Sequence, residues 1–181
     1  MRPVGYLLNT KEGLEGEPGL FYNYILAGNG LFVRGENSLI RATIMIAPAE
    51  VRGLVPMVES VVLPGGKVPR SLFDLALSVM LASPYRERYL AVVWDDGYHL
   101  KEPRQQGDGS GIRYDRLPNT VVDIHSHGHM GAFFSSIDDR DEQGLGIYAV
   151  VGKLNTPQQE VLLRAGVYGH YSYLSLEEVF G

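Results

Sequence analysis

The sequence predicts an α+β fold, because helical and strand patterns are mixed along the chain without a regular strand–helix–strand repeat. The 181 residues are enough for one ordinary domain, or for a core domain with a smaller one appended. Apolar residues make up 45% of the chain, so we expect a packed core rather than disorder. We predict a β-rich N-terminal extension over residues 1–66 and a second domain over residues 67–181.

The N-terminal extension reads as strands separated by turns. Phe21–Gly28 is aromatic and aliphatic, and Leu31–Arg34 is the predicted return strand. The Asn29-Gly30 pair between them predicts a type I′ hairpin turn, because both central residues of that turn need positive φ. Leu39–Ile46 is a further predicted strand, with apolar residues at alternate positions, and Ala47-Pro48 ends it.

A helix is predicted directly after the Pro/Gly-rich linker Leu63–Pro69. Ser71, with Asp74 three residues on, indicates the N-terminus of this helix, and Pro84 indicates its end. Apolar residues recur at i, i+3, i+4, i+7 and i+8, which gives the helix one apolar face. These residues are Leu72, Leu75, Ala76, Val79 and Met80.

Apolar runs predict the strands of the second domain. Lys101–Pro118, by contrast, is polar and rich in Gly, Gln, Asp and Arg, so we expect a long mobile loop there. The tail Leu174–Phe180 is expected to form a short closing turn or helix. The predicted strands are Tyr89–Trp94, Thr120–His125, Ile147–Val151 and Glu160–Tyr168.

Composition excludes several kinds of site and partner. The chain has no cysteine, so disulfides and cysteine nucleophiles are excluded, and only His, Asp or Glu can hold a zinc ion. A net charge of -5 argues against a nucleic-acid partner, because nucleic-acid-binding domains are usually basic. No apolar run approaches the roughly 20 residues of a membrane-spanning helix, and the N-terminus lacks a signal-peptide pattern. We therefore expect a soluble, cytoplasmic protein without a membrane partner.

The informative segment is His125-Ser126-His127, separated by seven residues from Ser135-Ser136-Ile137-Asp138. Side chains alternate along a strand, so His125 and His127 are expected on one face at the end of the strand. Ser135 and Ser136 each have an acid three residues on, which places Asp138 in the first turn of a predicted helix. Two imidazoles and one carboxylate can bind Zn²⁺ with one position open for water, whose pKa zinc lowers to roughly 7.

A hydrolase with this site also needs a general base and a hydrogen-bond donor for the oxyanion. Glu87 is the candidate base, because it heads the strand that follows the predicted helix. Ser135 is the candidate donor, because it lies one helical turn before Asp138. Glu59 and Glu102 are alternatives for the base. Each fragment alone would indicate a surface histidine or a helix cap, but the joint spacing favours a metal site.

Other polar residues near the motif have more than one interpretation. Asp123 alternates with the histidines, so it either orients a histidine ring or is a satisfied polar residue near the sheet end. His129 is interpreted as a loop histidine, and contact with substrate is the less favoured alternative. His99 and His170 lie outside any pattern and are assigned no role.

The motif resembles that of the JAMM (MPN+) metalloproteases, which has a Glu on an early strand, then His-x-His, about seven residues, and Ser-x-x-Asp. The resemblance covers residues 68–170, and it implies an MPN/JAMM-like, cytidine-deaminase-like mixed sheet with flanking helices. It also implies a zinc-dependent peptidase or isopeptidase whose substrate is a peptide or the tail of a ubiquitin-like protein. The matching residues are the metal ligands His125, His127 and Asp138 and the catalytic residues Glu87 and Ser135.

The two ends of the chain resemble the prokaryotic branch called PRTRC system protein A. This resemblance implies a genetic neighbourhood with a ThiF-like activating enzyme and a ubiquitin-like small protein. Asp123-Ile124 and Gly128 stand where many JAMM members have an aromatic pair and a proline, which changes the expected shape of the substrate channel. The matching segments are Tyr24, Gly28–Phe32, Arg52–Leu54, Gly166–Gly169 and Glu178–Phe180.

Two other functions are compatible with the same residues. One is a zinc hydrolase that cuts a small amide or a carrier-bound amino acid. The other is an MPN-type binding or scaffold module whose metal is structural or vestigial.

Overall fold

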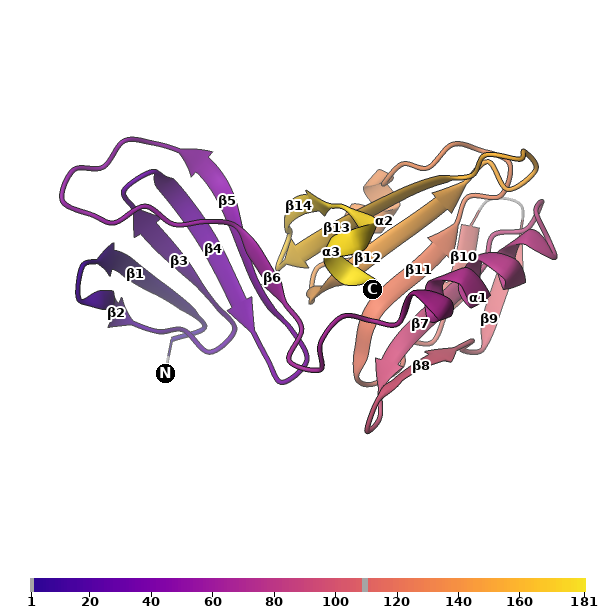
Figure 1. Ribbon diagram of the computed structural model, residues 1–181, viewed down its shortest axis with the longest axis horizontal. Coiled ribbons are helices and arrows are strands. Elements are labelled where there is room, and N and C mark those ends of the chain that lie inside the picture. The colour runs from indigo at the N-terminus through magenta and orange to yellow at the C-terminus, as the bar shows by residue number, and fades with distance from the viewer. Residues whose placement is uncertain (1, 109–110) are drawn as a thin grey trace. The chain divides into compact units, whose positions relative to one another are not determined.

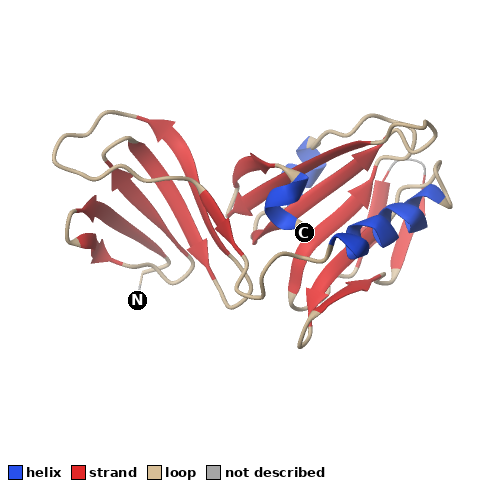
Figure 2. Ribbon diagram, viewed as in Figure 1, coloured by secondary structure: helices blue, strands red, loops and turns tan. Residues whose placement is uncertain are grey.

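The computed structural model describes residues 2–108 and 111–181 (Figure 1). Among them are two six-stranded sheets, one two-stranded sheet and three helices (Figure 2). This mixture confirms the α+β prediction, while the cytidine-deaminase-like arrangement stays a prediction. The chain divides into two compact units, which are described separately below. The first comprises Met1–Pro64, Glu142–Leu145 and Ala165–Ser172, and the second comprises Gly65–Asp141, Gly146–Arg164 and Tyr173–Gly181.

The first sheet is formed by the N-terminal part of the chain. Its strand order is β2-β1-β3-β4-β5-β6, with β1 and β3 parallel and the other neighbours antiparallel. Buried Leu7, Ile25, Ala27 and Phe32 form a core on one face, and two methionines pack against it. The strands are β1 (Val4–Thr10), β2 (Gly13–Glu17), β3 (Tyr22–Ala27), β4 (Gly30–Glu36), β5 (Arg41–Pro48) and β6 (Ser60–Val62).

The predicted hairpin forms between β3 and β4, but its turn differs from the prediction. Ala27 pairs with Gly30, so Gly28 and Asn29 are the central residues, and neither has positive φ. The prediction of a type I′ turn at Asn29-Gly30 is therefore wrong. The cause is tertiary: Gly28 N donates to Val55 O at 2.9 Å, and the Asn29 side chain hydrogen-bonds both backbone groups of Met57.

Residues from the C-terminal part of the chain complete the first unit. A side chain at Gly35 would meet Leu145 and Val167, whose side chains would lie 3.1 Å from its Cβ. The rings of Tyr22 and Tyr168 stack with their centroids 4.9 Å apart. This unit is therefore assembled from segments far apart in the sequence.

The second sheet has the strand order β14-β13-β12-β11-β7-β8. Its central strand, β11, is parallel to β12 and antiparallel to β7, and β7 forms a hairpin with β8. Ile124 and its partner Leu90 are buried in the sheet centre. The strands are β7 (Tyr89–Trp94), β8 (Tyr98–Lys101), β11 (Thr120–Ser126), β12 (Leu145–Gly152), β13 (Glu160–Val167) and β14 (His170–Leu174).

The predicted helix is α1 (Arg70–Leu81), but its buried face differs from the predicted stripe. Phe73, Ala76 and Met80 are buried, whereas Leu75 is 51% exposed. The prediction that Ser71 and Asp74 cap the helix is also wrong, because the N-cap residue is Pro69 and no side chain caps the helix.

The C-terminal tail forms a short helix, as expected. Helix α3 (Leu176–Val179) begins with a capping box between Ser175 and Glu178. The Phe180 ring that follows packs against Phe73 of α1 at a centroid distance of 5.1 Å. This contact explains which face of α1 is buried.

The polar segment Lys101–Pro118 contains a hairpin, which corrects the prediction of a loop. Its strands are β9 (Gln105–Asp108) and β10 (Gly111–Tyr114), and residues 109–110 lie outside the described residues. Tyr114 stacks on Tyr89 of β7 with the ring centroids 3.5 Å apart. Gln105 Oε1 accepts a hydrogen bond from Tyr89 N, and Gln105 Nε2 donates one to Tyr89 O.

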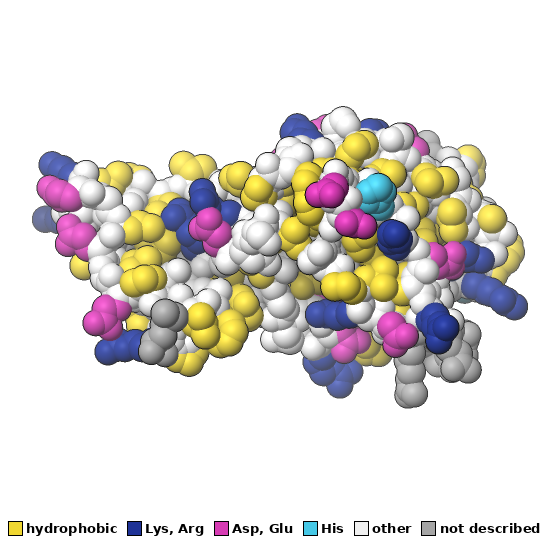
Figure 3. Space-filling view, turned by 90° about the horizontal axis from the view of Figure 1, so that it is seen from below, with side chains coloured by type: hydrophobic (Ala, Val, Ile, Leu, Met, Phe, Trp, Pro, Cys, Tyr) yellow, Lys and Arg dark blue, Asp and Glu magenta, His cyan; other side chains and the backbone are white. Residues whose placement is uncertain are grey.

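Charged and apolar side chains are interspersed on the surface. Figure 3 shows one face on which Lys/Arg and Asp/Glu side chains lie among hydrophobic ones. Among the described residues, no helix is long and apolar enough to cross a membrane.

Candidate metal centre

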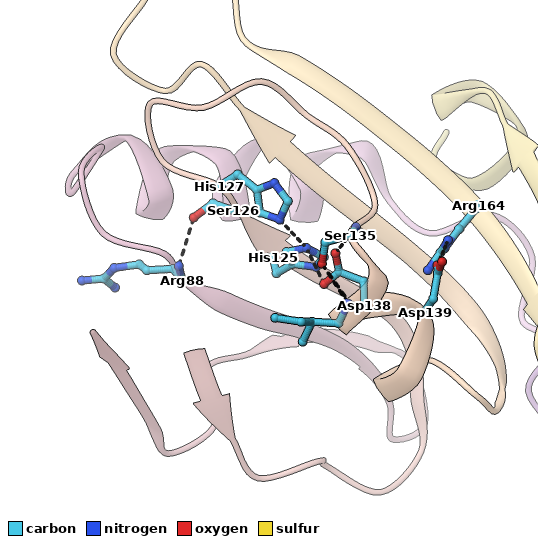
Figure 4. Close-up of polar contacts among 9 residues, drawn as sticks. Arg88, His125, Ser126, His127, Ser135, Asp138, Asp139 and Arg164 are labelled. Atoms are coloured by element: carbon cyan, nitrogen blue, oxygen red, sulfur yellow. Dashed lines mark hydrogen bonds and ion pairs between the residues drawn. The ribbon is translucent and has the colours of Figure 1, made fainter. Parts of the chain in front are cut away.

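His125 lies near the end of β11 and His127 directly after it, where the backbone is held from both sides (Figure 4). His125 pairs with Val150 of β12 and with Tyr89 of β7. His127 N donates to Val151 O at 2.9 Å. The two imidazole centroids are 5.0 Å apart, so the structure brings both rings together, as strand alternation predicts.

Asp138 lies in the first turn of α2 (Ser136–Asp141), as predicted. Ser135 Oγ accepts hydrogen bonds from the backbone N–H groups of Ile137 and Asp138, each at 3.2 Å. In return, Asp138 Oδ2 accepts one from Ser135 N at 2.6 Å. This reciprocal pattern is a capping box, and it orients the Asp138 carboxylate while leaving Oδ1 for another partner.

Three possible ligand atoms converge at this end of the sheet. His125 Nε2 lies 3.2 Å from His127 Nε2 and 3.4 Å from Asp138 Oδ1. The three residues can offer ligand atoms that all lie within 4.8 Å of one another. Ligands at the corners of a tetrahedron about 2.0–2.1 Å from zinc are about 3.3–3.4 Å apart. Two of the three separations match that edge length, and the third lies within 4.8 Å, so the three side chains are close enough to share one metal ion.

Burial favours the ligating form of His125. Burial lowers the pKa of His125 to about 4, although the Asp138 carboxylate opposes this shift. His125 is therefore neutral at pH 7 and can present a lone pair to a metal. His127 Nδ1 is buried and has no hydrogen-bond partner among the described residues. A tautomer with its proton on Nδ1 leaves Nε2 of His127 free to ligate.

The sequence prediction missed two phenylalanines that contact the histidine rings and an arginine that packs on one of these phenylalanines. Phe133 packs against the His127 ring at 4.5 Å, and Phe134 lies 6.4 Å from the His125 ring. Arg164 lies over the Phe134 ring at 3.8 Å. A single arginine in the apolar run of β13 was the available signal for Arg164, whereas nothing in the sequence singles out the two phenylalanines.

Asp123 is a half-buried carboxylate with a hydrogen-bond partner, which agrees with the second of its two predicted interpretations. It accepts a hydrogen bond from the hydroxyl of Tyr89. Burial raises the pKa of Asp123, while Tyr89 and the charge of Arg116 act in the opposite direction. The interactions found for this carboxylate are with Tyr89 and Arg116.

Glu87, the candidate base, is half-buried and lies two residues before β7. Ser126 N donates to Arg88 O at 2.8 Å, so the pairing of β11 with β7 continues beyond Tyr89. In this antiparallel register the position opposite His127 is Glu87.

The other acids and histidines have separate surroundings. Glu102 forms an ion pair with Arg88 at 3.1 Å, and Glu59 accepts a hydrogen bond from Met45 N in the first unit. His129 is exposed in a turn, so its interpretation as a loop histidine is confirmed. His170, which had no predicted role, hydrogen-bonds with the Tyr24 hydroxyl in the first unit.

Residues 79–165 match a family described as prokaryotic homologs of the JAB domain. The matched range contains Glu87, His125, His127, Ser135 and Asp138, and it supports the JAB/MPN family for this part of the chain. It includes neither end of the chain, so the resemblance to PRTRC system protein A stays a prediction. A comparison with curated proteins finds no significant match.

Proposed function

We propose that this chain is a zinc-dependent metallopeptidase or isopeptidase. The observation that carries the proposal is the convergence of His125, His127 and Asp138 at separations suited to zinc. The match of residues 79–165 to prokaryotic homologs of the JAB domain supports it, since all the residues that resemble the JAMM motif lie within this range.

The metal ligands would be Nε2 of both histidines and a carboxylate oxygen of Asp138. Bound zinc would act as a Lewis acid: it lowers the pKa of a water ligand to roughly 7 and polarises a substrate carbonyl. The absence of cysteine from the sequence agrees with a nitrogen and oxygen donor set.

Glu87 and Ser135 are the proposed catalytic residues. Glu87 would take the proton of the attacking water and pass it to the leaving amine. Its register position opposite His127 supports this role. Ser135 would donate a hydrogen bond to the oxyanion. Because Ser135 Oγ already accepts two backbone hydrogen bonds, its own proton is the group available for substrate.

The proposed substrate is an extended peptide or the tail of a ubiquitin-like protein, with a ThiF-like activating enzyme as a partner in the same system. The segment Lys101–Pro118 would clamp that tail. Gln105 supports this role, because its side-chain amide hydrogen-bonds the N–H and the carbonyl of Tyr89. An extended chain would pair with the same two backbone groups. Removal of the β9–β10 hairpin should abolish cleavage of a conjugate, and unchanged cleavage would exclude the clamp.

Elemental analysis of wild type and His125→Ala tests the metal site. We expect about one zinc per wild-type chain and none in the variant, because a site with three protein ligands loses one of them. His99→Ala is the matched control, since the His99 side chain hydrogen-bonds Asp95 O away from the cluster. Wild type without zinc after reconstitution would exclude the hydrolase and leave the binding module.

Glu87→Gln then separates an enzyme from a binding module. For an enzyme, the variant should retain zinc and lose cleavage of a ubiquitin-like conjugate, whereas Glu102→Gln should retain both. For a binding module, wild type has no cleavage to lose, and partner binding survives the substitution. Cleavage of small amides but not of conjugates would instead identify the small-amide hydrolase.

A further inference from the structure

Arg164 of β13 is a buried cation whose partners include Asp139 and Phe134, and it lies near the three candidate metal ligands. Its side chain is 5% exposed, and Nη1 lies 2.7 Å from Asp139 Oδ1. Its guanidinium carbon lies 3.8 Å from the centre of the Phe134 ring. A buried charge is costly without such partners, so these contacts hold the side chain in one place.

The first partner, Asp139, links Arg164 to the ligand Asp138. Helix α2 has six residues, none of them buried. A helix this short is not stable alone, so its position depends on contacts with the rest of the protein. Figure 4 shows Asp138 directed toward the histidines and Asp139 directed toward Arg164. The ion pair therefore fixes the side of α2 that faces the cluster.

The second partner, Phe134, links Arg164 to the ligand His125. The Phe134 and His125 rings are 6.4 Å apart and nearly perpendicular, at 73°. A guanidinium held over one face of Phe134 restricts the rotamers open to that ring. Arg164 is thus linked to two of the three candidate ligands, to Asp138 through Asp139 and to His125 through Phe134.

We propose that Arg164 is a positioning residue of the metal centre, which sets zinc affinity by holding Asp138 through Asp139 and His125 through Phe134. This inference rests on the proposed zinc site. Partners of metal ligands in other proteins change metal affinity by about 10–100-fold when they are replaced.

The test compares Arg164→Met, Arg164→Lys and wild type, with zinc titrated against a chromophoric chelator. We expect the zinc Kd of Arg164→Met to rise by about 10–100-fold. Lysine keeps the charge for Asp139 but loses the planar stack on Phe134, so Arg164→Lys should recover part of the affinity. Visible spectra of Co²⁺-loaded protein should show altered band positions and intensities in Arg164→Met.

Arg70→Met is the matched control, because Arg70 also combines an ion pair, with Asp74 at 3.2 Å, and a contact with a phenylalanine ring, Phe73 at 5.6 Å. It should leave the zinc Kd and the Co²⁺ spectrum unchanged. If Arg164→Met does not fold, Asp139→Asn replaces it, since that carboxylate is 52% exposed.

A folded variant, Arg164→Met or Asp139→Asn, with a wild-type Kd and Co²⁺ spectrum would overturn the positioning role while the zinc site stands. A wild-type protein that binds no zinc would overturn both proposals.

Discussion

The hydroxyl of Tyr89 on β7 donates a hydrogen bond to the carboxylate of Asp123 on β11. Asp123 lies two residues before the candidate ligand His125, and Tyr89 is the direct cross-strand partner of that histidine. The pair therefore ties β11, which carries His125, to its neighbour β7.

Tyr89→Phe should destabilise the fold, because it leaves the half-buried carboxylate of Asp123 without its phenol donor. We expect a loss of about 1–3 kcal/mol in the free energy of unfolding, measured by urea denaturation. Tyr98→Phe is the control, because its hydroxyl bonds Gly66 O in an exposed place, and it should cost less than about 1 kcal/mol. Equal effects of the two variants would contradict a special role for the Tyr89–Asp123 pair.

The metal-free protein should lose stability as the pH falls from about 6.5 to about 4. The pKa of His125 is lowered from 6.5 to about 4 in the fold, so the unfolded chain binds the proton more readily throughout this window. His125→Asn lacks this group. The stability difference between wild type and variant should be constant above pH 7 and shift against wild type by up to about 3 kcal/mol near pH 4. A difference that does not change with pH would show that His125 is not buried in its neutral form.

Gly152→Ala should disturb the turn after His127. A Cβ at Gly152 would overlap backbone atoms of Met130, Gly131 and Ala132, and backbone cannot move aside as a flexible side chain can. We expect a cost of about 1–3 kcal/mol in thermal or urea unfolding, together with weaker zinc binding. Gly131→Ala is the control, since its Cβ would meet only a Glu160 carboxylate oxygen. Full stability of Gly152→Ala would contradict the close packing.

Ser135→Ala should affect both the helix and the reaction. Loss of the cap should cost about 0.5–2 kcal/mol of stability. Loss of the proposed oxyanion donor should lower kcat by about 10²–10³-fold with zinc retained, measured on a cleavable conjugate. Ser136→Ala, one residue on, should change kcat little. If kcat falls only in proportion to the zinc that is lost, Ser135 is a cap and not a donor.

The convergence of His125, His127 and Asp138 was predictable because its geometry is local. Strand alternation brings His125 and His127 to one face, and a serine three residues before an acid marks the start of α2. The long-range contacts were not predictable in this way. Arg164 and Asp139 are 25 positions apart, and no short-range pattern pairs them.

The wrong predictions also have tertiary causes. Apolar residues occur on several faces of α1, so periodicity allowed more than one stripe, and contact with Phe180 selects the face with Phe73. The turn at Gly28 and Asn29 follows hydrogen bonds to a segment more than twenty residues away, with Val55 and Met57 as partners. The hairpin in Lys101–Pro118 carries few apolar residues, so its sequence lacks the apolar runs that predict strands.

The first unit is built from segments far apart in the sequence, and this affects when it can fold during synthesis on the ribosome. Its sheet is made of early residues, but Gly35 leaves room for Leu145 and Val167, and Tyr22 stacks on Tyr168. A nascent chain that has emerged only to Pro64 has the strands of this unit without Glu142–Leu145 and Ala165–Ser172. The first unit therefore reaches its native packing only after the chain has been translated through Ser172.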